Sequence, residues 1–196
     1  VELAGRLRAR GFAIGHLDLG GSLGVPYRPG EARPDLAAYL AGVRKLVEGK
    51  NLTLVFEPGR WIVADAGALL ARVLYRKRNG AKEFIIVDAA MNDLIRPALY
   101  QAWHEIVPLR KTPFGTVTAD IVGPICETGD FLARDRVVAN LMPGDTLAVL
   151  TAGAYGFVAA SNYNSRPRVC EVLVDGASWR VVRRRESLDD LIRGEE

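Results

Sequence analysis

The chain has 196 residues, of which 49% are hydrophobic and 25% charged, a composition typical of a globular protein with an apolar core. Its 26 Lys and Arg against 23 Asp and Glu leave a net charge of +3, too small an excess to predict a nucleic acid or a membrane surface as a partner. No apolar run reaches the roughly 20 residues of a membrane-spanning helix. Two cysteines and two histidines predict neither a disulfide framework nor a structural zinc site, and they fit a reducing cytoplasm.

The beginning of the chain alternates helix and strand. An apolar stripe at helical spacing precedes Gly11, and the apolar run 12–19 then predicts a strand that ends at a glycine-rich turn. Pro34 suits the first turn of a second helix that Gly49 ends, and the run 52–56 predicts another buried strand. Strand, helix and strand in this order are typical of a parallel α/β arrangement.

From about residue 65 the pattern becomes mainly β. Strands are expected at 69–75 and 83–87, joined as a hairpin by Asn79-Gly80. A short helix is expected from 93 or 97 to about 103, and further strands at 116–122, 146–150, 169–174 and 179–183. A last helix is expected to be capped by Ser187, with Leu188, Leu191 and Ile192 facing inward. The change of pattern predicts two domains, residues 1–64 and residues 65–196.

Two parallel strands and two helices cannot close a sheet or cover both of its faces. An exposed apolar strand edge would also promote aggregation. We therefore expect the chain to be the C-terminal part of a longer protein.

Two motifs follow the first two predicted strands. Gly20-Gly21-Ser22 offers backbone N–H groups and a hydroxyl to a phosphate, although glycine-rich turns also follow strands for structural reasons alone. Glu57-Pro58-Gly59-Arg60 ends the next strand, and parallel pairing would bring it to the same sheet edge. Arg60 could bind an anion in bidentate fashion and Glu57 could pair with a protonated ring nitrogen, or the motif could be a surface turn with an ion pair.

Three motifs in the second part carry side chains suited to a substrate. Arg96 and Tyr100 are four residues apart on a predicted helix and share a face, which could bind a carboxylate or simply face solvent. Cys126 and Glu127 lie in a loop where the thiol could donate a proton, although a lone cysteine is often an inert apolar residue. Tyr155 stands in a bend between glycines, where a ligand could approach or the ring could pack the turn.

Three further features are given structural interpretations. His16 and Cys170 lie in predicted strands, and Arg183-Arg184-Arg185 is expected to be the solvated end of a strand. If the arginine run bound nucleic acid instead, that binding would depend steeply on salt concentration.

The order of these motifs resembles the diaminopimelate decarboxylase family over essentially the whole chain. The matching segments are Leu17-Asp-Leu-Gly-Gly-Ser-Leu-Gly-Val-Pro-Tyr27, Glu57-Pro-Gly-Arg60, Asp88-Ala-Ala-Met-Asn-Asp-Leu-Ile-Arg-Pro-Ala-Leu-Tyr100, Cys126-Glu-Thr-Gly-Asp130 and Gly153-Ala-Tyr155. The resemblance implies a fold that is α/β followed by mainly β. Residues 1–64 would be the last strands of a (β/α)8 barrel that binds pyridoxal 5'-phosphate, and residues 65–196 a β-sandwich or β-barrel-like domain that completes the active site.

The resemblance also assigns roles around the cofactor. The cofactor-binding residues would be Gly20, Gly21, Ser22, Glu57, Pro58, Gly59, Arg60 and Tyr155. The glycine turn, Arg60 and Tyr155 would hold the phosphate, and Glu57 would keep the pyridine nitrogen protonated, which strengthens the ring as an electron sink. Cys126 would act as the general acid that protonates the carbon after CO2 has left.

The implied substrate is meso-2,6-diaminopimelate, and the implied product is L-lysine. Its distal end carries both an ammonium and a carboxylate: Arg60, Arg96 and Tyr100 would bind the carboxylate and Glu127 the ammonium, with Tyr155 also at the substrate. The related ornithine decarboxylases typically have Asp after the cysteine, so Glu127 together with Arg96 favours diaminopimelate.

Two departures from the family qualify these expectations. Ser22 stands where the family usually has a third glycine, and none of the five lysines (Lys45, Lys50, Lys77, Lys82 and Lys111) lies in the motif of the Schiff-base lysine. We therefore expect the isolated chain to be inactive and the whole protein to be a cytoplasmic homodimer with shared active sites. The alternatives are an ornithine- or arginine-type decarboxylase and an inactive regulatory homologue, and retention of Cys126 and Glu127 argues against the latter.

Overall fold

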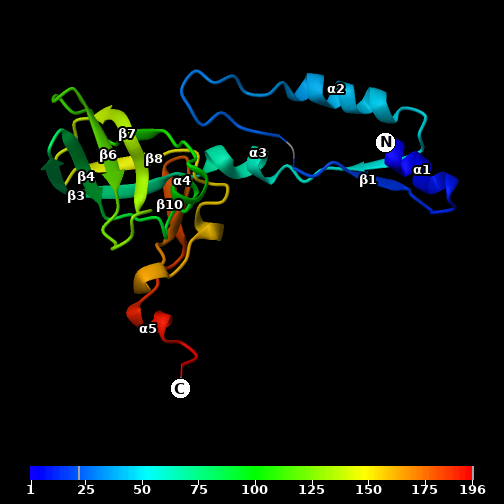
Figure 1. Ribbon diagram of the computed structural model, residues 1–196. Helices are drawn as coiled ribbons and strands as arrows, with labels where there is room; N and C mark the ends of the chain where they lie inside the picture. Colours follow the sequence, from blue (N-terminus) through cyan, green and yellow to red (C-terminus); the bar gives the residue numbers. More distant parts are fainter. Residues whose placement is uncertain (22, 196) are drawn as a thin grey trace. The chain divides into compact units, whose positions relative to one another are not determined.

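The computed structural model describes residues 1–21 and 23–195 (Figure 1). The chain divides into two compact units, Val1–Ala64 and Asp65–Glu196. Ser22, expected to offer a hydroxyl to the phosphate, lies outside the described residues. Within the described ranges, no helix combines the length and the apolar character that crossing a bilayer requires.

The first unit contains a parallel pair of strands between helices, as the sequence predicted. In chain order its elements are α1 (Glu2–Ala9), β1 (His16–Asp18), α2 (Leu36–Val47), β2 (Thr53–Val55), α3 (Gly59–Val63) and a 3-10 turn at Ala64–Ala66. Strands β1 and β2 pair in parallel, with Leu17 opposite Leu54. Both strands are shorter than expected, because only three residue pairs are in register.

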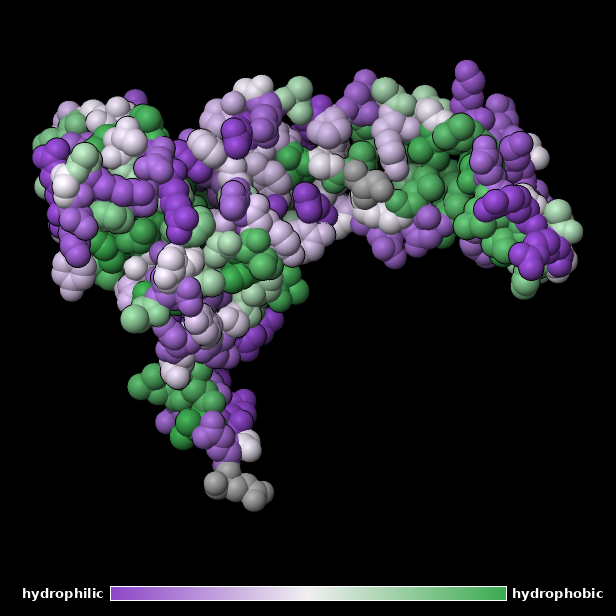
Figure 2. All heavy atoms as spheres, in the orientation of Figure 1, coloured by the Kyte–Doolittle hydropathy of each residue, from purple (hydrophilic) through white to green (hydrophobic). Residues whose placement is uncertain are grey.

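Helix α2 begins later than Pro34 suggested. The carboxylate of Asp35 accepts the N–H of Ala38 at 3.0 Å, so Asp35 is the N-cap and Pro34 precedes the helix. Apolar side chains of this unit remain at its surface, among them Leu3 and Phe12, and Figure 2 shows such hydrophobic surface around α1.

The second unit is built around a six-stranded mixed sheet. Its elements are β3 (Leu69–Asn79), β4 (Lys82–Val87), α4 (Arg96–Tyr100), β5 (Ile106–Pro108), β6 (Thr116–Val122), β7 (Phe131–Ala139) and β8 (Thr146–Val149). The strand order is β5-β8-β3-β4-β6-β7, with β4 and β6 parallel and the other pairs antiparallel. The end strands β5 and β7 contact each other, so the sheet curls into a nearly closed barrel (Figure 1). The mainly β fold class of this part is confirmed.

The barrel encloses the hydrophobic core. Its fully buried side chains come from neighbouring strands and include Val73, Ile85, Ile121, Leu132 and Leu147. Alternation along the strands places these residues on the inner face, and the burial of such side chains is the main driving force for folding.

The expected hairpin at Asn79-Gly80 forms, but strand β7 was not predicted. Gly80 has a positive φ of 61°, and Asn79 pairs with Lys82 across the turn. In β7 the register shifts near Asp135, whose φ is 45°, so the apolar alternation that marks a strand is interrupted by a bulge.

An antiparallel ribbon and a short helix end the chain. The remaining elements are two 3-10 turns (Phe157–Ala159 and Tyr163–Ser165), β9 (Glu171–Asp175), β10 (Ser178–Arg183) and α5 (Leu188–Leu191). Ser187 and Asp190 form the capping box expected for α5. The expectation that its apolar residues face inward is wrong, because Leu188 is 71% exposed and Ile192 59%, and Figure 2 shows this hydrophobic surface.

Candidate active site

The glycine turn and the Glu57 motif lie side by side at the carboxyl ends of β1 and β2. The N–H of Leu19 donates to the carbonyl of Val55 at 3.0 Å, and the N–H of Glu57 donates to the carbonyl of Gly20 at 2.9 Å. The parallel pairing thus continues past the strands into both loops. The expectation that the two motifs meet at one sheet edge is confirmed.

The glycine turn leaves no space for a side chain at its closest approach to Glu57. A Cβ added to Gly21 would lie 2.7 Å from the backbone oxygen of Glu57. Gly20 has a φ of 63°, and its N–H donates to the Asp18 carboxylate at 2.7 Å. Gly20 therefore shapes the turn, and Gly21 keeps bare backbone against the Glu57 peptide.

The Glu57 motif adds a carboxylate and a guanidinium to this edge. The side chain of Glu57 is exposed, and its carbonyl accepts the N–H of Gly59 at 2.8 Å in a tight turn. Pro58 is the N-cap of α3, and Arg60 lies partly buried in its first turn. Bare backbone, a carboxylate and a guanidinium along one edge fit a group that carries both a phosphate and a protonated ring nitrogen.

In the second unit, Asp130 fixes the loop that carries Cys126 and Glu127. This loop connects β6 to β7, and the buried Asp130 carboxylate accepts the N–H groups of Met91 at 2.8 Å and Ile125 at 2.9 Å. Burial raises the pKa of Asp130, while these hydrogen bonds act in the opposite direction. Asp130 thus ties the loop to the segment that precedes α4.

Glu127 is held as an ionised acceptor beside an accessible thiol. Its carboxylate accepts the N–H of Gly129 at 3.0 Å and the hydroxyl of Tyr163 at 2.9 Å. These hydrogen bonds, the one from Gly129 first, lower the pKa of Glu127. Cys126 is exposed and forms no disulfide, so the loop presents a thiol next to a carboxylate.

Sequence reasoning missed the segment that brings Tyr163 to Glu127. The carbonyl of Asn92 accepts the N–H of Ser161 at 2.9 Å, and its side-chain oxygen accepts the Nε of Arg166 at 3.0 Å. Asn92 belongs to the motif 88–100, so its position in the sequence was a usable signal. Tyr163 stands in an irregular stretch, where no pattern pointed to it.

Helix α4 carries both residues that were expected to act together, and they differ in burial. Arg96 is only 7% exposed, whereas Tyr100 is 69% exposed. The alternative of a solvated helix side is therefore wrong for Arg96. Its guanidinium lies 2.8 Å from the Nε2 atom of His104, a buried residue that sequence reasoning also missed.

Tyr155 follows β8 in a tight turn. Its φ is 59°, and a Cβ at Gly156 would overlap the carbonyl of Ala152. The side chain of Tyr155 remains 47% exposed. The turn therefore positions the ring at the surface and does not bury it within the turn.

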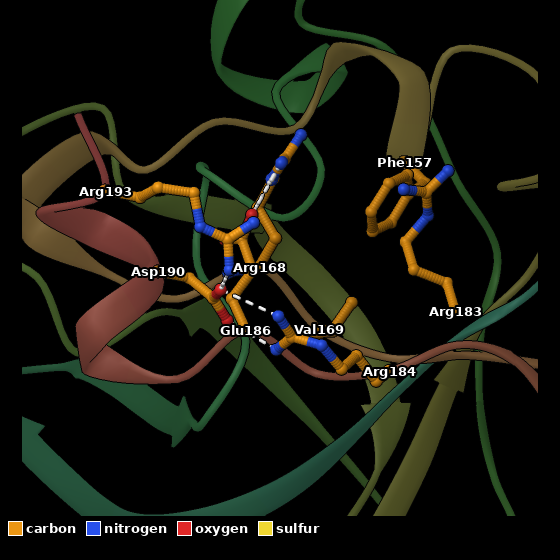
Figure 3. Close-up of a pocket in the computed structure, with 8 residues that line it drawn as sticks. All are labelled: Phe157, Arg168, Val169, Arg183, Arg184, Glu186, Asp190 and Arg193. Atoms are coloured by element: carbon orange, nitrogen blue, oxygen red, sulfur yellow. Dashed lines mark hydrogen bonds and ion pairs between the residues drawn. The ribbon is translucent and has the colours of Figure 1, made fainter.

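A separate cavity lies beside β10 and α5 (Figure 3). It has a volume of about 350 Å³, and its lining is rich in arginine: Phe157, Arg168, Val169, Arg183, Arg184, Glu186, Asp190 and Arg193. Arg168 pairs with Glu186 at 2.5 Å and lowers the pKa of that carboxyl to about 2, and both Arg184 and Arg193 pair with Asp190. Arg184 of the arginine run is thus ion-paired as well as exposed, and none of the predicted site residues that the structure describes lines this cavity.

Comparison with known proteins adds to this geometry. The model for the pyridoxal binding domain of pyridoxal-dependent decarboxylases matches residues 1–64, and the model for their C-terminal sheet domain matches residues 38–153. Diaminopimelate decarboxylase of Pseudomonas aeruginosa is 58% identical over 196 residues, and that of Neisseria meningitidis serogroup B (strain MC58) is 51% identical over 193 residues. These matches cover 100% and 98% of this chain and 46% of each relative, so the chain spans about half the length of these curated relatives.

A solved structure is similar in both sequence and fold. The crystal structure of diaminopimelate decarboxylase from Helicobacter pylori complexed with L-lysine has 43% identity and a TM-score of 0.88, and the match covers 98% of this chain and 47% of that one. The C-terminal sheet model alone accounts for more than half of the residues. On this evidence, the chain belongs to the pyridoxal-dependent decarboxylases.

Proposed function

We propose that the protein containing this chain decarboxylates meso-2,6-diaminopimelate to L-lysine and CO2 with pyridoxal 5'-phosphate as cofactor. One observation carries the proposal. The bare backbone of Gly21 lies against the Glu57 motif at a single sheet edge, in a chain that is 58% identical over its whole length to a named diaminopimelate decarboxylase.

The cofactor is proposed to bind at this sheet edge. Gly21 and Arg60, with Tyr155 from the second unit, hold the phosphate, and the exposed carboxylate of Glu57 keeps the pyridine nitrogen protonated. When bound, pyridoxal 5'-phosphate supplies an electron sink for the pair of electrons that departing CO2 leaves behind. Ser22 is proposed as a further phosphate ligand through its hydroxyl.

The substrate is proposed to be recognised at its distal amino acid group. The ionised Glu127 pairs with the distal ammonium, and Arg60, Arg96 and Tyr100 bind the distal carboxylate. A substrate with only an amine at that end would offer no carboxylate to the guanidinium of Arg96, so this contact would be lost. This asymmetry supports diaminopimelate over ornithine.

Cys126 is proposed to supply the proton. Its accessible thiol holds a proton and delivers it to the α-carbon of the substrate, while Asp130 keeps the loop in place through Met91 and Ile125. Because the thiol is not part of a disulfide, this role fits a reducing compartment, and we propose a cytoplasmic enzyme.

The two units are proposed to be the C-terminal end of a (β/α)8 barrel (residues 1–64) and the β domain that completes the active site (residues 65–196). The Schiff-base lysine would then come from outside these residues, and the isolated chain would be inactive. We further propose a homodimer in which the Cys126 loop reaches the cofactor of the partner subunit. Exposure of that loop supports this arrangement.

Borohydride reduction tests the cofactor assignment. The whole protein and this chain alone are incubated with pyridoxal 5'-phosphate and reduced, and adducts are located by peptide mass spectrometry. We expect one adduct on a lysine residue outside this chain and none within it. We also expect the whole protein to release free L-lysine from diaminopimelate and to leave ornithine and arginine unchanged. A stoichiometric adduct on one of the five lysines of this chain, or no adduct at all, would refute the assignment.

Mixing two inactive variants tests the shared sites. Cys126→Ala and Glu57→Ala place their defects in different units of the chain. If each active site takes residues from both subunits, mixed dimers contain one intact site, and activity returns after subunit exchange. Persistent inactivity of a mixture that sedimentation shows to contain mixed dimers would contradict the shared-site arrangement.

A further inference from the structure

His104 lies fully buried between α4 and β5, with both ring nitrogens bonded. Its exposed fraction is 0%. Its Nε2 lies 2.8 Å from the Nη1 of Arg96, and its Nδ1 lies 2.9 Å from the carbonyl oxygen of Leu150. One imidazole therefore joins the helix that carries Arg96 to the end of β8.

These partners allow only one protonation state. A carbonyl oxygen can only accept, so the Nδ1 atom of His104 carries the hydrogen; a guanidinium can only donate, so the Nε2 atom is the acceptor. Burial lowers the pKa of His104 to about 4, and the nearby charges of Arg96 and Arg136 act in the same direction. At neutral pH the ring is thus the uncharged tautomer that accepts a hydrogen bond from Arg96.

The peptide of His104 is fixed as firmly as its ring. The carbonyl of His104 accepts the Nη1 of the buried Arg136 at 2.8 Å, and that guanidinium stacks 3.0 Å from the ring centre of Trp103. On the next residue, the carbonyl of Glu105 accepts the N–H of Leu150 at 2.8 Å. The imidazole consequently has little freedom to move relative to either partner.

Leu150, the second partner of the His104 ring, lies in the segment that leads to Tyr155, another predicted substrate residue. Leu150 directly follows β8, and two residues separate it from the tight turn at 153–155 that contains Tyr155. His104 therefore connects Arg96 on one element with the turn of Tyr155 on another, and both residues are proposed to contact the substrate.

We propose that His104 is a positioning residue for substrate recognition: it orients the guanidinium of Arg96 toward the distal carboxylate and sets its distance from the Tyr155 turn. This inference rests on the proposed function, which assigns the carboxylate to Arg96. The hydrogen bond to His104 favours one direction of the Arg96 guanidinium, and bidentate binding of a carboxylate depends on the direction of its planar N–H fork.

The test is a double-mutant cycle in the whole enzyme with its cofactor. We compare His104→Leu, Arg96→Met and the double variant. We expect His104→Leu to raise the KM for diaminopimelate about tenfold or more, with a smaller change in kcat and unchanged affinity for pyridoxal 5'-phosphate. In the Arg96→Met background, the same substitution should add little.

The outcomes distinguish failure of the proposed function from failure of the positioning role of His104. If Arg96→Met leaves the KM unchanged, the role of Arg96 in the proposed function fails, and this inference fails with it. If Arg96→Met raises the KM but His104→Leu has the same effect in both backgrounds, or none, only the positioning role is overturned. Partial recovery in His104→Gln, whose amide oxygen can accept from Arg96, would support it.

A second measurement does not depend on activity or on the stability of the Leu variant. In the ¹⁵N-histidine-labelled wild-type enzyme, the resonance missing from His104→Gln identifies His104. We expect the chemical shifts of a neutral ring with hydrogen on Nδ1, and a change at Nε2 in Arg96→Met. A cationic ring at neutral pH, or hydrogen on Nε2, would overturn the inference.

Discussion

Gly21 lies against the backbone of Glu57 with no space for even one methyl group. The added Cβ of Gly21→Ala would stand 2.7 Å from the Glu57 oxygen, where ordinary contact begins near 3.4 Å, so the two peptides must separate by about 0.7 Å. The neighbouring hydrogen bond from the N–H of Glu57 to the carbonyl of Gly20 resists that movement. The substitution therefore strains the junction where we place the cofactor.

The expected cost is about 1–3 kcal/mol, the range measured when extra carbon atoms are forced into well-packed sites. If the cofactor requires the undisturbed junction, this free energy appears as a 5- to 140-fold rise, roughly, in the Kd for pyridoxal 5'-phosphate. If the strain is already present without cofactor, it lowers the melting temperature instead. Gly24→Ala is the matched control, because its Cβ would meet no atom of the described residues within 4 Å.

The assay is an equilibrium titration of the cofactor-free whole protein with pyridoxal 5'-phosphate, followed by absorbance, with a thermal melt of each variant. Gly24→Ala should match the wild type in both measurements. A Gly21→Ala protein that binds and melts like the wild type would refute the close approach and, with it, the assignment of the cofactor to this sheet edge.

Three other predictions concern the second unit. Cys126→Ser should reduce kcat about 100-fold or more in lysine-release assays, because a general acid is lost. The control Cys170→Ser should keep the wild-type kcat. Equal losses in the two variants would contradict the role of Cys126 as the proton donor. Tyr163→Phe deletes the 2.9 Å hydrogen bond to Glu127 and should raise the KM for diaminopimelate about two- to fivefold. The effect is modest because both side chains are exposed. Unchanged steady-state kinetics would contradict this prediction. The pKa of His104 falls from 6.5 to about 4 on folding, so below pH 6.5 the unfolded chain takes up a proton that the folded chain does not. From pH 6.5 down to pH 4, the free energy of unfolding of the wild type should therefore fall by about 3 kcal/mol more than that of His104→Gln, as measured by denaturant titration. If the free energy of unfolding fell equally with pH in both proteins, His104 would not be held neutral.

Local signals in the sequence predicted most of the elements. Asn79-Gly80 specifies the β3–β4 hairpin because its turn needs positive φ, and Ser187 with Asp190 specifies the start of α5 through reciprocal hydrogen bonds. Strand β7 was missed because the bulge at Asp135 interrupts its alternation. The prediction that the apolar residues of α5 face inward was wrong, because a capping box determines where a helix begins and not what packs against it.

By itself, the sequence determined the chemistry available to the site. Short-range motifs singled out the glycine turn, Glu57, Arg60 and Cys126 as candidates, because a tight turn, a charge and a proton-donating thiol are properties of the residues themselves. Parallel strand pairing was enough to place the first two motifs at one sheet edge, since the carboxyl ends of neighbouring parallel strands coincide.

Only the tertiary structure decided which partners hold those groups. Tyr163 meets Glu127 across 36 positions of the chain, and His104 reaches Leu150 across 46. Such contacts leave no periodic trace in the sequence, because they depend on how the barrel closes and not on neighbours along the backbone. The burial of Arg96 could not be predicted for the same reason. Helical spacing gives the direction of a side chain, but only the packed barrel decides whether that side chain meets solvent or His104.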